Sequence, residues 1–260
     1  MGVVLKSKVW LVALALLSSA VTNMYAQPAV ASAIESGDRE VRARRPVAAL
    51  AYYETALASA PSDFSALWRV SATLIDVSEF DTNAARRKAA FLRAAELARQ
   101  AIAVRPNDAA GHFHLARALG REALTVSARE RTGYALDVRT SALRALSIDS
   151  THAGALHVMG RWNAEVMRLN SVTRMIARTF MGGQVFSEAS WARAAALLER
   201  ANAIEPNRTV HQLALAQVYR DTGKKDRARA MYEAAINAPL VDANDEAYKR
   251  EAQRELGELR

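Results

Sequence analysis

Residues 209–239, TVHQLALAQVYRDTGKKDRARAMYEAAINAP, decide the fold, because they predict two short helices joined by a tight turn. Gly223 lies between the two halves and can adopt the backbone conformation that such a turn requires. Pro239 ends the second half, since proline lacks the N–H of a continuing helix and clashes with the preceding turn. Small residues occupy the positions where the two helices would touch, namely Ala216, Ala228 and Ala235. The segment therefore predicts an antiparallel helical hairpin.

The closing turn of this hairpin recurs along the chain. Alanine-rich last helical turns are each followed by a residue that is expected to end the helix. These helix-ending positions, called chain stops below, are Pro61, Pro106, Ser150, Pro206 and Pro239. Self-similarity of this kind is the signature of a repeat architecture, and residues 209–239 follow the 34-residue tetratricopeptide template. A first repeat that starts at Val30 fits nearly as well, with Gly37 and Tyr53 at template positions eight and twenty-four. The chain is thus predicted to be an all-α solenoid of about five tetratricopeptide-type hairpins.

The middle repeats are longer than the template, because the stops at residues 61, 106, 150 and 206 are 45, 44 and 56 residues apart. We expect the additional residues between the two helices of each pair, as longer helices or as a loop. Residues 242–259 predict a final helix that caps the solenoid, with Asp242 or Asn244 at its N-cap. The outer face of this capping helix is expected to be polar through Glu251, Arg254, Glu255 and Arg260.

The N-terminal segment has the pattern of a secretory signal peptide. Lys6 and Lys8 precede the largely apolar run 9–21, and cleavage is expected after Ala26, with the A-x-A sequence at 29–31 as a second site. The apolar run is short for a transmembrane helix, which needs about 20 residues.

The domain organisation and the location follow from this pattern. We expect a signal peptide at residues 1–26 and a tetratricopeptide-repeat domain at residues 30–260, with no transmembrane span after cleavage. The protein is predicted to be periplasmic or secreted. An uncleaved N-terminal membrane anchor is the alternative.

Composition excludes several classes of function. The chain has no cysteine, which rules out disulfides, thiolate metal sites and a cysteine nucleophile. The formal charge of +8 falls to +6 without Lys6 and Lys8, and the other basic residues are interleaved with acidic ones. Such a spread is typical of a solvated surface, so no nucleic-acid partner is expected.

Catalytic and metal-binding patterns are missing from the sequence. His112 and His114 are two residues apart, and His152 and His157 are five apart. Neither pair therefore has the i, i+4 spacing that places two metal ligands on one helical face. No HExxH, GxSxG or glycine-rich phosphate loop occurs. We expect no enzymatic activity, no catalytic residues, no metal and no cofactor.

Three short sequence segments show a closer resemblance, to one particular protein family. Residues 64–69, FSALWR, open the second repeat, residues 159–162, MGRW, lie in the fourth, and residues 219–224, YRDTGK, precede a helical tail. In order and spacing, residues 38–258 resemble the regulator of microtubule dynamics family of tetratricopeptide proteins. The resemblance implies an all-helical domain without catalytic activity. Eukaryotic members are associated with microtubules and organelle contacts, and lipid binding is attributed to the repeat domain of one member. This chain differs in its secretory-type N-terminus and is similar to a bacterial-type exported member.

The first helices of successive repeats line a concave groove in this architecture. Template position five faces the groove and is occupied in repeats two to five by Trp68, Phe113, His157 and Leu213. Position nine is occupied by Ala72, Arg117, Arg161 and Gln217. Arginine binds carboxylate and phosphate through two parallel hydrogen bonds. Apart from Ala72, these residues are the predicted ligand groove, suited to a peptide with an acidic group or to a phospholipid.

Several alternatives stay open at this point. Trp68 and Phe113 also suit core positions, the two groove arginines also suit structural ion pairs, and Trp162 is expected in the core. The leading hypothesis for function is a scaffold that binds a protein or peptide partner in the cell envelope. A phospholipid or amphiphile carrier and a cytoskeleton-associated role are the alternatives. A second candidate surface is an amphipathic basic stretch in the fourth repeat, at Val172, Met175, Ile176 and Phe180.

Overall fold

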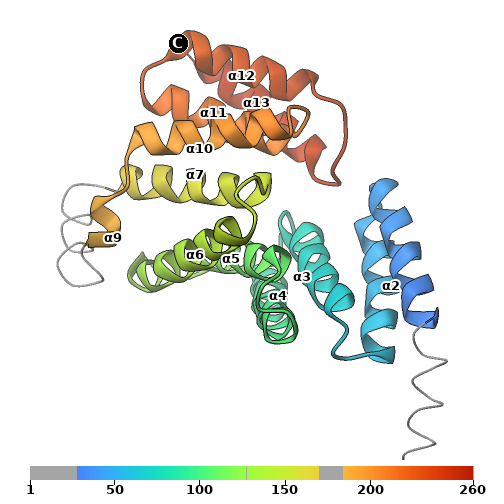
Figure 1. The fold of residues 1–260 in the computed structure, drawn as a ribbon. Coiled ribbons are helices and arrows are strands. Elements are labelled where there is room, and N and C mark those ends of the chain that lie inside the picture. Colours follow the sequence, from blue (N-terminus) through green and yellow to red (C-terminus); the bar gives the residue numbers. More distant parts are fainter. Residues whose placement is uncertain (1–27, 127, 170–183, 260) are drawn as a thin grey trace, which may run out of the picture.

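The structure is a computed structural model that describes residues 28–126, 128–169 and 184–259, and every regular element in those ranges is an α-helix. After a first helix at residues 28–42, the helices are α2 (Pro46–Ser59), α3 (Phe64–Ser78), α4 (Ala84–Val104), α5 (Ala109–Ala123), α6 (Ala128–Ile148), α7 (Ala153–Arg168), α9 (Gln184–Ser187), α10 (Trp191–Ile204), α11 (Thr209–Asp221), α12 (Lys225–Asn237) and α13 (Asp245–Glu258). Figure 1 shows them stacked in pairs along the chain. The predicted all-α, tetratricopeptide-type solenoid is confirmed.

The helices form hairpins that stack in chain order. Helix 28–42 pairs with α2, α3 with α4, α5 with α6, α7 with α10 and α11 with α12, and α13 packs on the last pair. The first helices of successive hairpins are also neighbours, since α3 contacts α5, α5 contacts α7 and α7 contacts α11. They form an inner layer, and the second helices form an outer one.

The predicted chain stops coincide with helix ends. The second helices end at Ser59, Val104, Ile148, Ile204 and Asn237, each two residues before its stop. Side chains also cap the starts of several helices by accepting a hydrogen bond from a backbone N–H of the first turn, namely those of Asp63, Asn83, Asp108, His152 and Ser190. Gly223, in the turn between α11 and α12, has a φ of +72°, which a residue with a side chain rarely adopts. Short-range signals thus fix the boundaries of the hairpins.

Both expected forms of enlargement occur in the middle repeats. Helices α4 and α6 are each 21 residues long, whereas the fourth hairpin has an insertion that includes α9 between α7 and α10. The expected amphipathic stretch at Val172, Met175, Ile176 and Phe180 lies outside the described residues, and so does the expected signal peptide at 1–26.

Close helix packing depends on Gly160 of α7. A Cβ atom at this position would lie 2.6 Å from Cγ of Leu198 and 3.2 Å from the carbonyl oxygen of Ala194, both in α10. Leu198 is completely buried and cannot move aside freely.

We therefore expect Gly160→Ala to destabilise the protein by about 1–2 kcal/mol, because the overlap outweighs the helix propensity gained. The matched control is Gly120→Ala in α5, where the added methyl group meets no atom within 4 Å. That variant should be neutral or stabilised by up to about 1 kcal/mol. Urea unfolding measures both, and equal stability of the two variants would contradict the packing argument.

Candidate functional site

The two aromatic residues predicted for the groove lie on neighbouring inner helices and contact histidines. The Trp68 ring of α3 stacks on His114 of α5, with ring centroids 5.3 Å apart and an interplanar angle of 4°. The guanidinium of Arg69 lies 4.2 Å above the Trp68 ring. The Phe113 ring is 4.5 Å from the ring of His152. Trp68 and Phe113 stay partly exposed on the inner layer, and the buried His114 lies between their rings.

The two predicted groove arginines differ in their surroundings. Nη2 of Arg117 lies 2.6 Å from Oδ1 of Asp76. Burial lowers the pKa of Arg117, but the Asp76 carboxylate outweighs this effect and raises the pKa above its usual value. Arg161 has no such close partner, because its nearest carboxylate oxygen, on Glu165, is 3.3 Å away. Arg117 is therefore engaged in a close ion pair with a residue of a neighbouring hairpin, whereas Arg161 makes only a longer ion pair, with Glu165 one turn away on its own helix.

Arg161 lies among charged groups of both signs. Burial lowers its pKa, and the neighbouring guanidinium groups of Arg121 and Arg168 lower it further, against the opposite effect of Glu165. Its side chain is nevertheless 39% exposed, so it lines the inner surface. Its Nη1 donates a hydrogen bond of 3.1 Å to Oε1 of Gln217. Arg161 and Gln217, both predicted groove residues, are thus brought into contact.

His157 forms a pair with His211, a residue that the sequence analysis did not single out. The two Nδ1 atoms are 3.1 Å apart, and Nε2 of His211 is 3.0 Å from Oε2 of Glu205. A carboxylate accepts hydrogen bonds, so His211 donates from Nε2 and a neutral His211 accepts from His157 at Nδ1. Burial, together with His211 and Arg161, holds the pKa of His157 well below its usual range. His157 is therefore neutral near pH 7.

The remaining two predicted groove residues are covered by the protein itself. Leu213 is only 4% exposed and belongs to the apolar core around α11. Gln217 is 7% exposed, and its Nε2 donates to Glu251 at 3.2 Å and to Glu255 at 3.1 Å. Both acids belong to α13, which covers this end of the inner layer.

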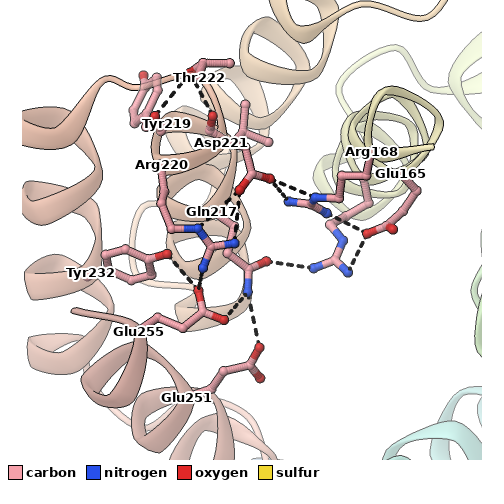
Figure 2. Close-up of polar contacts among 12 residues, drawn as sticks. Glu165, Arg168, Gln217, Tyr219, Arg220, Asp221, Thr222, Tyr232, Glu251 and Glu255 are labelled. Atoms are coloured by element: carbon pink, nitrogen blue, oxygen red, sulfur yellow. Dashed lines mark hydrogen bonds and ion pairs between the residues drawn. The ribbon is translucent and has the colours of Figure 1, made fainter. Parts of the chain in front are cut away.

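Glu255 is the centre of a polar network that joins α7, α11, α12 and α13 (Figure 2). Its Oε2 accepts hydrogen bonds from Arg220 at 2.6 Å and from the hydroxyl of Tyr232 at 2.7 Å. Arg168 of α7 joins the network through Asp221 of α11, at 2.5 Å. The expectation that Glu255 lies on a polar outer face is wrong, because the residue is only 6% exposed. The spacing of Tyr248, Ala252 and Glu255 could have indicated that these residues share one helical face.

The C-terminal helix also reaches across the inner layer to α3. Nδ2 of Asn244 donates to the carbonyl oxygen of Asp76 at 3.0 Å, and the Tyr248 hydroxyl contacts Oε1 of Glu79 at 2.7 Å. Asn244 stands at the N-cap position of α13, as expected, but its side chain makes this distant contact instead of capping the helix. Figure 1 shows the segment before α13 approaching the end of α3. The inner surface is thus partly closed by the chain's own C-terminus.

Two further properties concern the described residues alone. None of their helices combines the length and the apolar character needed to cross a membrane. Within the same ranges, no cluster of three or more histidine, aspartate or glutamate side chains is placed to hold a metal ion.

The stacked hairpins and their inner surface define a tetratricopeptide-repeat protein. Residues 31–260 match the family described as "Regulator of microtubule dynamics protein 1-3", and the chain belongs to this family. TTC0263, a thermophilic TPR protein in Thermus thermophilus, is similar with a TM-score of 0.63 and 22% identity, over 87% of this chain and 100% of that one. Pseudomonas aeruginosa pilF is similar with a TM-score of 0.48 and 14% identity, over 89% and 90%. No curated protein sequence matches significantly.

Proposed function

We propose that the protein is a non-catalytic scaffold that binds a protein or peptide partner in the cell envelope through its inner surface. The repeat fold supports this role, because stacked hairpins present an extended concave surface to a partner. The partly exposed aromatic residues Trp68 and Phe113 supply apolar contact area on the same inner layer as Arg161. An extended segment with an aromatic or aliphatic residue and a carboxylate fits this combination.

Arg161 is the observation that carries the proposal. Five other arginines on or near the inner layer have a carboxylate oxygen at 2.5–2.8 Å, namely Arg69, Arg117, Arg121, Arg168 and Arg220. The closest carboxylate to Arg161 belongs to Glu165, which lies nearer to Arg168, at 2.6 Å. Arg161 therefore keeps capacity for an incoming anion, which would also relieve its repulsion from Arg121 and Arg168.

A screen of the full chain against a displayed library of random peptides with free C-termini tests the proposal. Enriched peptides are expected to carry an acidic and an aromatic or aliphatic residue. Arg161→Ala should weaken their binding at least about tenfold, since hydrogen bonds to charged groups contribute about 1.5–3 kcal/mol. The control is Arg99→Ala on the outer helix α4, which should bind as the unchanged protein does. Equal binding by both variants would contradict a role for Arg161.

A phospholipid or amphiphile carrier is the second candidate function. The same guanidinium and aromatic surface supports it, because arginine binds phosphate as readily as carboxylate. Intact masses of the purified protein under native and denaturing conditions distinguish the two. An added mass seen only under native conditions favours the carrier, and its absence together with peptide binding favours the scaffold.

The envelope location and the cytoskeletal alternative need separate tests. Loss of residues 1–26 from protein expressed with its own N-terminus, with recovery from the periplasm or the medium, would support export. Full-length protein in the membrane fraction would instead favour an N-terminal anchor. Co-sedimentation with polymerised tubulin would favour the role that the family's description names.

A further inference from the structure

A pocket lies at the junction of α6, α7 and α10, away from the inner surface. Its volume is about 360 Å³, within the range of ligand-binding pockets. Met159 and Trp162 of α7 form part of its lining, and apolar walls come from Leu143 of α6 and Leu197 of α10. Leu143 is 38% exposed, although most leucines of this chain are covered. We call this pocket the outer pocket.

The outer pocket belongs to the enlarged fourth repeat. In the fifth repeat a tight turn joins α11 to α12, whereas in the fourth the insertion separates α7 from α10. Glu188, which follows α9, lines the pocket, and Phe186 of α9 is buried and stacks on Trp162 with centroids 5.9 Å apart. The last residues of the insertion therefore contribute to one wall of the pocket, which otherwise lies between the third and fourth hairpins.

The charges around the outer pocket are unbalanced. Three arginines line it, Arg139, Arg193 and Arg200, against the single acid Glu188. Glu188 lies 2.7 Å from Arg139 and 3.5 Å from Arg193. The hydrogen bond described for Arg200 goes to a backbone carbonyl oxygen, that of Ser150, at 3.2 Å. The pocket thus combines an apolar lining with an excess of positive charge at exposed positions.

The spacing of the two exposed arginines points to the class of ligand. Arg193 and Arg200 are seven residues apart on α10, which places them about 10 Å apart along the helix axis. One head group of an amphiphile would contact both arginines only if their side chains bent towards each other. Two acidic side chains that are seven residues apart on a helix lie on one face with the same spacing as the two arginines.

We propose that the outer pocket binds a segment of a second protein that carries a pair of apolar side chains flanked by two acidic residues. The apolar side chains pack against Trp162, Leu143 and Leu197, and the carboxylates pair with Arg193 and Arg200. Because this surface is separate from Arg161, the protein holds two partners at once and bridges them. The inference does not depend on what the inner surface binds.

Two fluorescein-labelled, alanine-based helical peptides test the outer pocket by anisotropy with the full chain. Each contains a Leu-Phe pair with a charged residue three positions before the leucine and three positions after the phenylalanine. The charged residues are glutamates in the acidic probe and lysines in the basic probe. The acidic probe is expected to bind at least tenfold more tightly than the basic one, and its affinity should fall as salt rises. Equal affinity for the two probes, or no binding of the acidic probe, would overturn the proposal.

Charge reversal makes the test specific to the pocket. The double variant Arg193→Glu/Arg200→Glu should exchange the preference and bind the basic probe more tightly than the acidic one. Both arginines are exposed, so the variant is expected to fold. Arg229→Ala, an exposed position on α12, is the matched control and should leave both affinities unchanged. A loss of acidic-probe binding in Arg161→Ala of the same size as in the double variant would assign the probe to the inner surface and contradict the proposal.

Discussion

Replacing Glu255 with alanine is expected to lower the free energy of unfolding by about 2–4 kcal/mol. The substitution removes one buried carboxylate that serves three donors: Arg220, Tyr232 and Gln217. Each donor would then lose this acceptor in a region that water reaches poorly. A buried donor without an acceptor lowers the free energy of unfolding unless the structure relaxes around it. Because Arg220 remains about one-third exposed, the cost should be below that of a fully buried ion pair.

The measurement is urea unfolding followed by far-ultraviolet circular dichroism. Glu258→Ala is the matched control, because Glu258 lies on the same helix, is 64% exposed and pairs with the exposed Arg254 one turn away. Its effect should stay below about 0.5 kcal/mol. Burial and the hydrogen bond to Glu255 raise the pKa of Tyr232, so this pKa should fall towards its usual value in Glu255→Ala. A Glu255→Ala protein as stable as the Glu258→Ala protein would show that the network does not hold α13 in place.

Acidification from about pH 7.5 to about pH 5 is expected to destabilise the protein strongly. Burial holds the pKa values of His114 and His157 well below the usual histidine value, and nearby arginines act in the same direction. The unfolded chain therefore takes up protons at a higher pH than the folded protein does. Below about pH 6.5 each of the two residues should remove up to about 1.4 kcal/mol of stability per pH unit. At lower pH, Asp38 and Glu205 should add to the loss, since their pKa values are lowered in the folded protein.

His114→Phe isolates one of these contributions. Phenylalanine keeps a ring between Trp68 and Phe113 but does not titrate, and Nδ1 of His114 has no hydrogen-bond partner to lose. The dependence of unfolding free energy on pH should therefore become shallower by about one proton. His112→Gln is the control, because the His112 ring forms a surface hydrogen bond with the carbonyl oxygen of Pro106. If unfolding free energy depended on pH as steeply in His114→Phe as in the control, His114 would not be a source of the pH dependence.

The candidate site was only partly predictable from the template. Positions five and nine identified residues that do lie on the inner helices, and Arg161 indeed contacts Gln217. The template carried no information on which arginine has a partner in another hairpin, because the distance from Arg117 to Asp76 depends on how the hairpins stack. His211 was missed for the same reason, since its partner His157 is 54 residues away.

The sequence by itself determined the helical hairpins, their boundaries and the glycine turn of the fifth repeat. These features depend on residues that are close together in the sequence. They are the periodicity of apolar residues, the prolines that end helices, and side-chain caps such as Asp63. Only the tertiary structure decided that α13 closes over the inner layer and that Glu255 is buried. The contact of Asn244 with Asp76 spans 168 residues, and it forms because small rotations between successive hairpins add up around the solenoid. The total rotation depends on the packing at every interface between helices, including the close contact at Gly160. No local sequence pattern encodes this total.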